Sequence, residues 1–300
     1  MTILVEIEAL SRRYGSTLAL DNVSLQAEVG LVYGLVGANG AGKTTLIKHL
    51  LGLLRPHRGT VRVFGLDPVR DPVAVLRRVG YLSEQRDLPE WMRLEELLRY
   101  TQAYHPSWDQ AYAERLLEDF GLDRGKKFSD LSQGMRAQAG LVVAVAHRPE
   151  LLVLDEPSSG LDVVVRQDIL DAIVRTVVED GRTVIFSSHL LDEVERMCDH
   201  VTVLHEGRVA VQGPVDEVRA THRVSQVRFP KPLESTPHVE GALSIAGDGR
   251  SWSIIHTSAL ESLREAVAQS RGEIIESRTA TLEEILIARV RRSNRQRQAA

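Results

Sequence analysis

The sequence predicts an α/β fold built around a largely parallel sheet. Short apolar runs of strand length, such as residues 31–36 and 151–154, alternate with segments of helical periodicity. A glycine-rich turn follows the first run and leads directly into a helical segment. The second run ends in two acidic residues, Asp155 and Glu156. Strands that alternate with helices favour parallel pairing, because each crossover returns the chain to the same edge of the sheet.

The first part of the chain is predicted to be rich in strands. Alternating or continuous apolar patterns predict strands at residues 3–8, 23–27, 31–36 and 59–64. Residues 44–54 are apolar enough for a buried helix, and Pro56 is expected to mark its end.

A helical insertion is expected between residues 90 and 130. Residues 94–98 and 112–117 have helical periods, and Asp109 and Asp119 lie near plausible helix ends. Further along, residues 151–154 and 183–186 predict short buried strands, so the α/β alternation returns.

The pattern changes near residue 220. Prolines between residues 230 and 237 suggest a linker, and Asp248-Gly249 between two apolar runs (243–246 and 252–257) predicts a hairpin. Helical stretches follow at residues 259–269 and 282–290, which predicts a small α+β appendage. The last sixteen residues contain five arginines and no acid, so we expect a solvated, frayed tail.

Composition narrows the class of protein. The 300 residues carry a formal net charge of −4, which gives no overall attraction for nucleic acid. A single cysteine, Cys198, suits a reducing compartment. The N-terminus has acids where a signal peptide needs bases, and no apolar run approaches the ~18 residues of a membrane helix. We therefore expect a cytosolic chain that does not span a membrane.

Residues 37–44 match the phosphate-loop pattern GxxxxGK[ST] between a predicted strand and a predicted helix. Glycines let the backbone wrap a phosphate chain, and the start of the helix attracts the same anion. Lys43 is expected to reach the β- and γ-phosphates, and the Thr44 hydroxyl is expected to help hold Mg²⁺.

The acidic end of the strand at residues 151–154 is costly to bury unless something compensates it. With a phosphate loop in the same chain, Mg²⁺ is the expected partner of Asp155. Glu156 is expected to orient or deprotonate an attacking water.

Four further motifs identify a family. They are Tyr14 in Arg12-Arg13-Tyr14-Gly15, Leu131-Ser132-Gln133-Gly134-Met135 before a helix, Ser159-Gly160-Leu161-Asp162, and Ser187-Ser188-His189. With the phosphate loop and the acidic strand, they make residues 3–218 resemble the ABC ATPase family, whose signature is usually LSGGQ. The signature here has Gln133 and Met135 where that pattern has Gly and Gln. The family also has a glutamine in the segment that here reads Gly80-Tyr81-Leu82-Ser83-Glu84-Gln85. That position aligns with Glu84 rather than with Gln85, and the choice between the two residues stays open.

The resemblance implies a P-loop NTPase core of the ABC ATPase type, with an antiparallel β-subdomain, a helical subdomain at about residues 84–140 and the small C-terminal α+β appendage. The ATPase domain would span residues 1–220, and an accessory domain with a basic tail would span residues 221–300. The implied cofactors are ATP and Mg²⁺. The implied nucleotide-binding residues are Tyr14, Gly37, Asn39, Gly40, Ala41, Gly42, Lys43, Thr44, Thr45, Ser132, Gly134 and Asp162. Lys43, Glu156 and His189 would be catalytic, and Thr44, Glu84 and Asp155 would hold the metal.

One phosphate loop and one signature in a chain imply that two cassettes must pair around ATP. The resemblance further implies integral membrane permease subunits as partners, with this chain peripheral on the cytoplasmic face of the membrane. Residues 103–109, the appendage and residues 281–286 resemble bacterial ABC-2-type ATPases, which mostly serve exporters of drugs, lipids or cell-envelope components. An importer ATPase, or a soluble mechanical ATPase of translation or DNA repair, is the alternative. No nucleic acid partner is expected.

Overall fold

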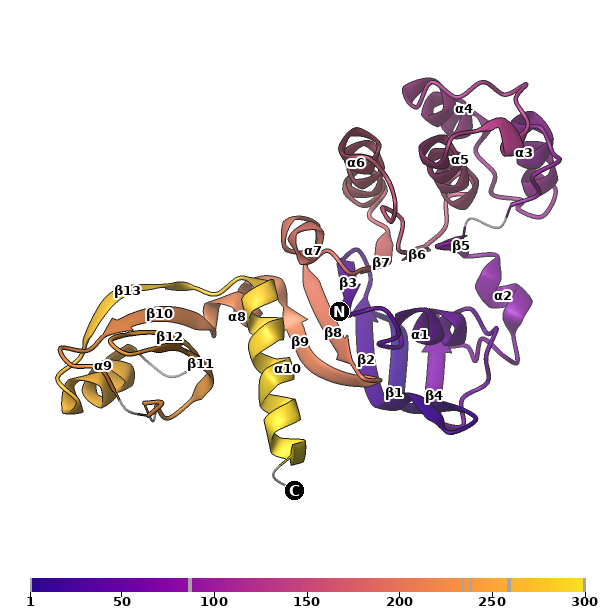
Figure 1. The fold of residues 1–300 in the computed structure, drawn as a ribbon. Coiled ribbons are helices and arrows are strands. Elements are labelled where there is room, and N and C mark those ends of the chain that lie inside the picture. Colours follow the sequence, from indigo (N-terminus) through magenta and orange to yellow (C-terminus); the bar gives the residue numbers. More distant parts are fainter. Residues whose placement is uncertain (1, 86–87, 234, 238, 258–259, 299–300) are drawn as a thin grey trace. The chain divides into compact units, whose positions relative to one another are not determined.

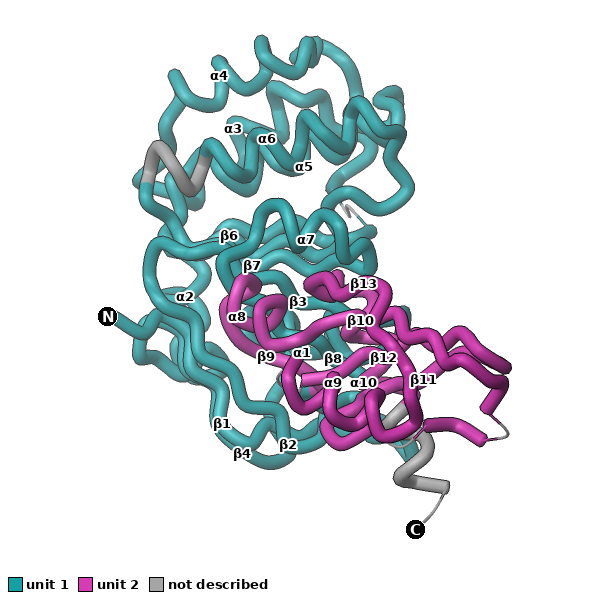
Figure 2. Tube along the Cα trace, turned by 90° about the vertical axis from the view of Figure 1, so that its left-hand side faces the viewer, with its two compact units in different colours: residues 1–209 teal, residues 210–300 magenta. Residues whose placement is uncertain are grey.

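The computed structural model describes residues 2–85, 88–233, 235–237, 239–257 and 260–298. The chain forms two compact units, Met1–Val209 and Ala210–Ala300 (Figure 2). The change that the sequence suggested at residues 220–221 lies inside the second unit, directly after helix α8 (Val215–Ala220).

Five strands, β5-β6-β7-β3-β8, of a six-stranded sheet with the order β5-β6-β7-β3-β8-β9 form the centre of the first unit (Figure 1). Its strands are β3 (Val32–Val36), β5 (Val79–Leu82), β6 (Leu151–Asp155), β7 (Thr183–Ser188), β8 (His200–His205) and β9 (Arg208–Pro214). Neighbouring strands from β5 to β8 pair in parallel. Every residue of β3, β6 and β7 is buried, as their apolar runs require for strands covered on both faces. The predicted parallel α/β core is confirmed.

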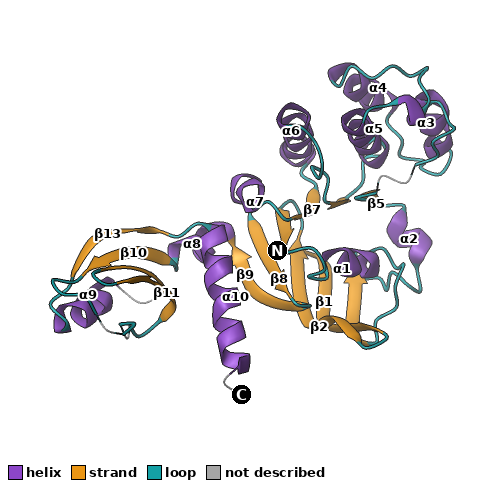
Figure 3. Ribbon diagram, in the orientation of Figure 1, coloured by secondary structure: helices purple, strands orange, loops and turns teal. Residues whose placement is uncertain are grey.

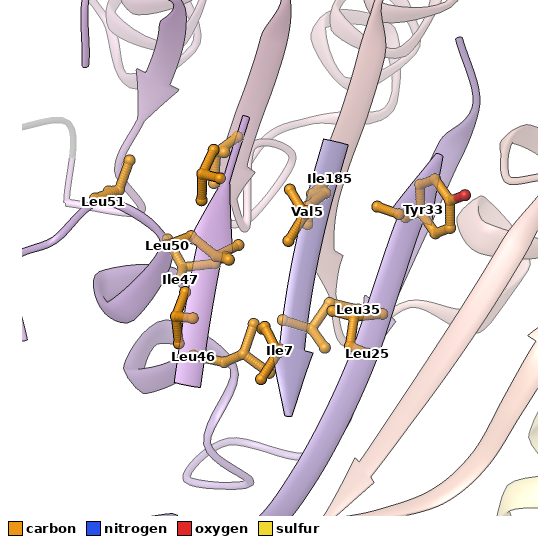
Figure 4. Close-up of a cluster of buried hydrophobic side chains, with 14 of the residues drawn as sticks. Val5, Ile7, Leu25, Tyr33, Leu35, Leu46, Ile47, Leu50, Leu51 and Ile185 are labelled. Atoms are coloured by element: carbon orange, nitrogen blue, oxygen red, sulfur yellow. The ribbon is translucent and has the colours of Figure 1, made fainter. Parts of the chain in front are cut away.

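A second sheet, with the order β2-β1-β4, is antiparallel. It comprises β1 (Ile3–Tyr14), β2 (Thr17–Glu28) and β4 (Arg58–Val63). Helix α1 (Lys43–Leu50) contributes to the core between this sheet and the central one (Figure 4). There Leu46, Ile47 and Leu50 share one buried cluster with Ile7 and Leu35. Burying each such side chain contributes about 1.5–3 kcal/mol, so both sheets fix the position of α1.

Helix α1 is shorter than the sequence suggested, and the prediction of a helix to Leu54 was wrong at that end. Gly52 has φ +70°, a left-handed conformation that glycine adopts without a steric penalty. The Leu53 backbone N–H donates to the Lys48 carbonyl at 2.9 Å, which closes the helix with a Schellman motif. Gly52, rather than Pro56, therefore terminates the helix.

The helical insertion is present (Figure 3). The helices between β4 and β8 are α2 (Pro72–Leu76), α3 (Leu94–Gln102), α4 (Gln110–Asp119), a 3₁₀ turn (Phe128–Asp130), α5 (Gln133–Val145), α6 (Val163–Asp180) and α7 (Leu191–Met197). Helix α5 contacts α3, α4 and α6. Asp109 caps α4 by accepting a hydrogen bond from the Tyr112 backbone N–H at 2.9 Å, as its position before the helical period predicted.

The second unit contains an antiparallel sheet with the order β11-β12-β10-β13. Its elements after α8 are β10 (Arg223–Arg228), β11 (Ala242–Asp248), β12 (Ser251–His256), α9 (Leu260–Gln269), β13 (Glu273–Thr279) and α10 (Leu282–Gln298). The hairpin predicted at Asp248-Gly249 joins β11 to β12, and the small α+β appendage is confirmed. Ala259, the predicted start of α9, lies outside the described residues. Helix α10 extends to Gln298, beyond the predicted end at residue 290, through a stretch without glycine or proline.

Within the ranges that the structure describes, no helix combines the length and the apolar character needed to cross a membrane.

Candidate functional site

Three neighbouring strands of the central sheet end beside one another. Strand β7 pairs with β3 on one side and with β6 on the other, all in parallel. The turn after Val36, the acidic pair at the end of β6 and His189 after β7 therefore emerge at one edge. This carboxyl edge is the usual place for a ligand site in an open α/β sheet.

The glycine-rich turn after β3 is shaped by its contact with β2. Gly42 has φ +111°, and a Cβ atom there would lie 2.7 Å from the Ala19 carbonyl oxygen, so only glycine fits. Residues 38–40, which include Asn39 and Gly40, are exposed, whereas Ala41, Gly42 and Lys43 are buried. Helix α1 then begins at Lys43 with the N–H groups of its first turn at the end that adjoins this turn, an arrangement that binds anions.

Lys43, Glu156 and His189 form one cluster. The Lys43 ammonium donates to the Gly37 carbonyl at 2.6 Å and lies 3.0 Å from Glu156 Oε1. His189 Nδ1 lies 2.7 Å from Glu156 Oε2, and since a carboxylate only accepts hydrogen bonds, the imidazole donates. Lys43 and Glu156 are both buried, so each compensates the charge of the other. The structure thus brings together the three residues expected to be catalytic.

Ser187, at the end of β7, fixes both acidic residues. Its hydroxyl donates to Asp155 Oδ1 at 2.7 Å and accepts from the Glu156 backbone N–H at 2.9 Å. Glu156 has φ +50°, an uncommon conformation for a residue with a side chain, and this hydrogen bond helps to hold it.

A cavity of about 380 Å³ lies beside this cluster. Thr44, Glu84, Gln85 and Asp155 line it, which brings the three residues expected to hold a metal to one place. Asp155 Oδ2 is buried and has no hydrogen-bond partner among the described residues. Carboxylate and hydroxyl oxygens are the ligands that Mg²⁺ prefers, so the residues present fit this ion.

The signature residues form a second group with the loop at residues 159–162. Ser132 caps α5 by accepting from the Met135 backbone N–H at 3.2 Å. The Gln133 side-chain amide lies so close to Gly160 that a Cβ atom there would be 2.6 Å from its nitrogen. Asp162 Oδ1 accepts from the backbone N–H groups of residues 164 and 165, each at 3.0 Å, and so caps the start of α6. Gly134 faces Val165 of α6, and a Cβ atom at Gly134 would lie 3.0 Å from the Val165 side chain, which is a tight contact.

Tyr14 lies at the end of β1 and is 44% exposed. The Arg12 guanidinium lies over its ring, 5.0 Å from the centroid. The stacking role expected of Tyr14 stays a prediction.

Sequence reasoning recognised the motif that contains Ser187 but not the function of this serine. The available signal was a hydroxyl at the end of one buried strand and carboxylates at the end of another. That signal becomes specific only when β6 and β7 are known to be neighbours, with Asp155 opposite Ser187.

Comparisons with known proteins agree with this geometry. A family model described as ABC transporter matches residues 20–159. The bacitracin transport ATP-binding protein BcrA of Enterococcus faecalis is 35% identical over 225 residues, which cover 74% of this chain and 73% of that protein. The daunorubicin/doxorubicin resistance ATP-binding protein DrrA of Streptomyces peucetius is 36% identical over 225 residues, which cover 73% and 68%. A solved structure described as the ATP-binding subunit of an ABC transporter is 33% identical with a TM-score of 0.67, and the match covers 72% of this chain and 92% of that one.

The fold and the phosphate loop define a P-loop nucleotide-binding protein. The chain belongs to the ABC transporter family, as an ATP-binding subunit that hydrolyses ATP.

Proposed function

We propose that this chain powers an exporter by ATP-driven pairing of two such subunits. The observation that carries the proposal is the cluster of Lys43, Glu156 and His189 at the carboxyl edge of the sheet. The names of the relatives BcrA and DrrA, which refer to bacitracin transport and to daunorubicin and doxorubicin resistance, support export of a drug, lipid or cell-envelope component.

In the proposed reaction, Lys43 binds the β- and γ-phosphates of ATP. The phosphate competes with Glu156 for the same ammonium, because both are anions close to it. Glu156 then orients the attacking water and accepts its proton, and His189 contacts the γ-phosphate. Thr44, Asp155 and Glu84 would hold Mg²⁺, which neutralises phosphate charge. The turn residues Gly37, Asn39, Gly40, Ala41, Gly42 and Thr45 would wrap the phosphates, and Tyr14 would stack on the adenine.

The second group of residues supports pairing. Ser132 and Gly134 lie at the start of α5, where the backbone N–H groups of the first turn and the helix dipole favour an anion. We propose that they bind the γ-phosphate held by a second subunit, with Asp162 at the same interface. Ser132→Arg places a long cationic side chain there and should abolish ATP-dependent dimerisation in size-exclusion chromatography. A variant that dimerises like the wild type would contradict the pairing proposal.

The same proposal includes membrane permease subunits as partners and a peripheral location on the cytoplasmic face of the membrane. A tagged Glu156→Gln variant should bind Mg-ATP and stall, because an amide is a much weaker base than a carboxylate. Purified with Mg-ATP from detergent-solubilised membranes of the source cells, it should retain a polytopic membrane protein at near one-to-one ratio. Recovery of ribosomes or DNA, or of no membrane protein, would contradict the transporter assignment.

A further inference from the structure

Glu193, on helix α7, is a buried acid that the proposed reaction does not use. It is 3% exposed, and its Oε2 atom accepts hydrogen bonds from two serine hydroxyls, Ser158 and Ser188, both at 2.9 Å. Its Oε1 atom lies 3.8 Å from Arg166 Nε of α6. One carboxyl group therefore links α7 to three other segments of the first unit.

Both serines stand next to reacting groups. Ser158 follows Glu156 by two positions, and the Ser159 backbone N–H donates to the Glu156 carbonyl at 3.1 Å. Ser188 precedes His189 directly, and its hydroxyl also accepts from the Leu190 backbone N–H at 3.0 Å. The two residues that flank His189, Ser188 and Leu190, are thus hydrogen-bonded to each other, and Ser188 is also hydrogen-bonded to Glu193.

The cost of burying Glu193 indicates a role beyond simple packing. A buried carboxyl group with one cation at 3.8 Å pays a desolvation penalty that an apolar side chain of similar size would avoid. The effect of the buried carboxyl group is geometric. Its Oε2 atom holds two loops, which follow different strands, at fixed positions relative to each other.

We propose that Glu193 is a positioning residue for ATP hydrolysis, which holds His189 and the loop from Ser158 to Asp162 in register with Glu156. This inference rests on the roles proposed above for Glu156 and His189. Glu193 acts through the two serines, and its loss should slow the chemical step while leaving ATP binding in place.

The test measures steady-state ATPase kinetics of Glu193→Ala, Glu193→Gln and the double variant Ser158→Ala/Ser188→Ala. We expect kcat to fall about tenfold to a hundredfold in Glu193→Ala and in the double serine variant, since small misplacements of reacting groups have effects of this size. The KM for ATP should stay within about threefold of the wild type, because the lost interaction does not serve ground-state binding. Glu193→Gln should retain more activity than Glu193→Ala, because its amide oxygen still accepts from both serines. Adding Glu193→Ala to the double serine variant should lower kcat little further.

The matched control is Asp192→Asn, which removes the same charge from an exposed neighbour on α7 and should leave kcat unchanged. If Glu193→Ala is insoluble, the single variants Ser158→Ala and Ser188→Ala each carry the test, and each should lower kcat. Wild-type kcat in these variants, or a loss of ATP binding parallel to the loss of activity, would overturn the proposal. Full activity in Glu156→Gln or His189→Ala would instead contradict the proposed function, so the two failures are distinguishable.

Discussion

Replacing Ser187 by alanine should destabilise the first unit more than the loss of a serine hydroxyl usually does. The Ser187 side chain is completely buried, and its hydroxyl makes two hydrogen bonds. One goes to the Asp155 carboxyl group at 2.7 Å, and the other comes from the Glu156 backbone N–H at 2.9 Å. Alanine removes both and brings no new partner to the buried N–H group.

The magnitude follows from the two losses. A hydrogen bond to a charged group contributes about 1.5–3 kcal/mol, and a buried N–H group left without a partner costs about 1–3 kcal/mol. Because the two losses share one hydroxyl and are not fully additive, we expect the free energy of unfolding to fall by about 3 kcal/mol. For a unit of this size, that change corresponds to a melting temperature lower by about 6–12 °C.

Scanning calorimetry of the full chain measures this shift. The control is Ser129→Ala, which deletes the same hydroxyl from an exposed site where it donates to the neighbouring Asp130 at 3.0 Å. That variant should stay within about 0.5 kcal/mol of the wild type. Equal melting temperatures for the two variants would refute the argument that Ser187 holds the acidic pair.

Three further predictions concern separate parts of the chain. Lys43→Ala should lower kcat for ATP hydrolysis by at least about a hundredfold, while the exposed-site control Lys126→Ala should not, and equal activities would contradict the role of Lys43. Burial lowers the pKa of His147 to about 4, with a smaller contribution from His105, so unfolding takes up a proton below pH ~6.5 and stability falls as the pH drops from 6.5 to 4. In urea titrations, the free energy of unfolding should fall between pH 7 and pH 4 by about 3 kcal/mol less in His147→Gln than in the wild type. Equal decreases in the two proteins would show that His147 does not cause the loss of stability at low pH. Leu263→Ala, in the buried core of the second unit, should lower the free energy of unfolding of that unit by about 2–5 kcal/mol in calorimetry, and a change as small as that of an exposed leucine would contradict its core position.

The secondary structure was largely readable from local patterns, because most elements depend on nearby residues. Residues 151–154 are continuously apolar and form β6, which is buried throughout. Asp248-Gly249 lies between two apolar runs and forms the predicted hairpin between β11 and β12. The end of α1 was missed because Gly52 lies inside an apolar stretch, where its left-handed φ outweighs the hydrophobic pattern.

The sequence motifs of the site were predictable, but the side-chain hydrogen bonds between them were not. The pattern of residues 37–44 and the acids at 155 and 156 each carried a chemical reason for phosphate and metal binding. The links made by Ser187 and Glu193 depend on which strands are neighbours, and periodicity does not specify the order of parallel strands. Side-chain hydrogen bonds between distant segments are therefore the part of the site that needed the structure.

These side-chain contacts connect the lysine proposed to bind phosphate with the loop that ends at Asp162. Lys43, Glu156 and His189 form a chain of contacts in which Glu156 is shared by a cation and an imidazole. In the proposed reaction, a phosphate at Lys43 weakens the first contact, so Glu156 is left with His189 and the water it must orient. Ser188 and Glu193 connect His189 to the loop that ends at Asp162, where a second subunit is proposed to bind. A phosphate bound at the Lys43 ammonium would then change the position of the proposed pairing surface through hydrogen bonds that are each 3.0 Å or shorter.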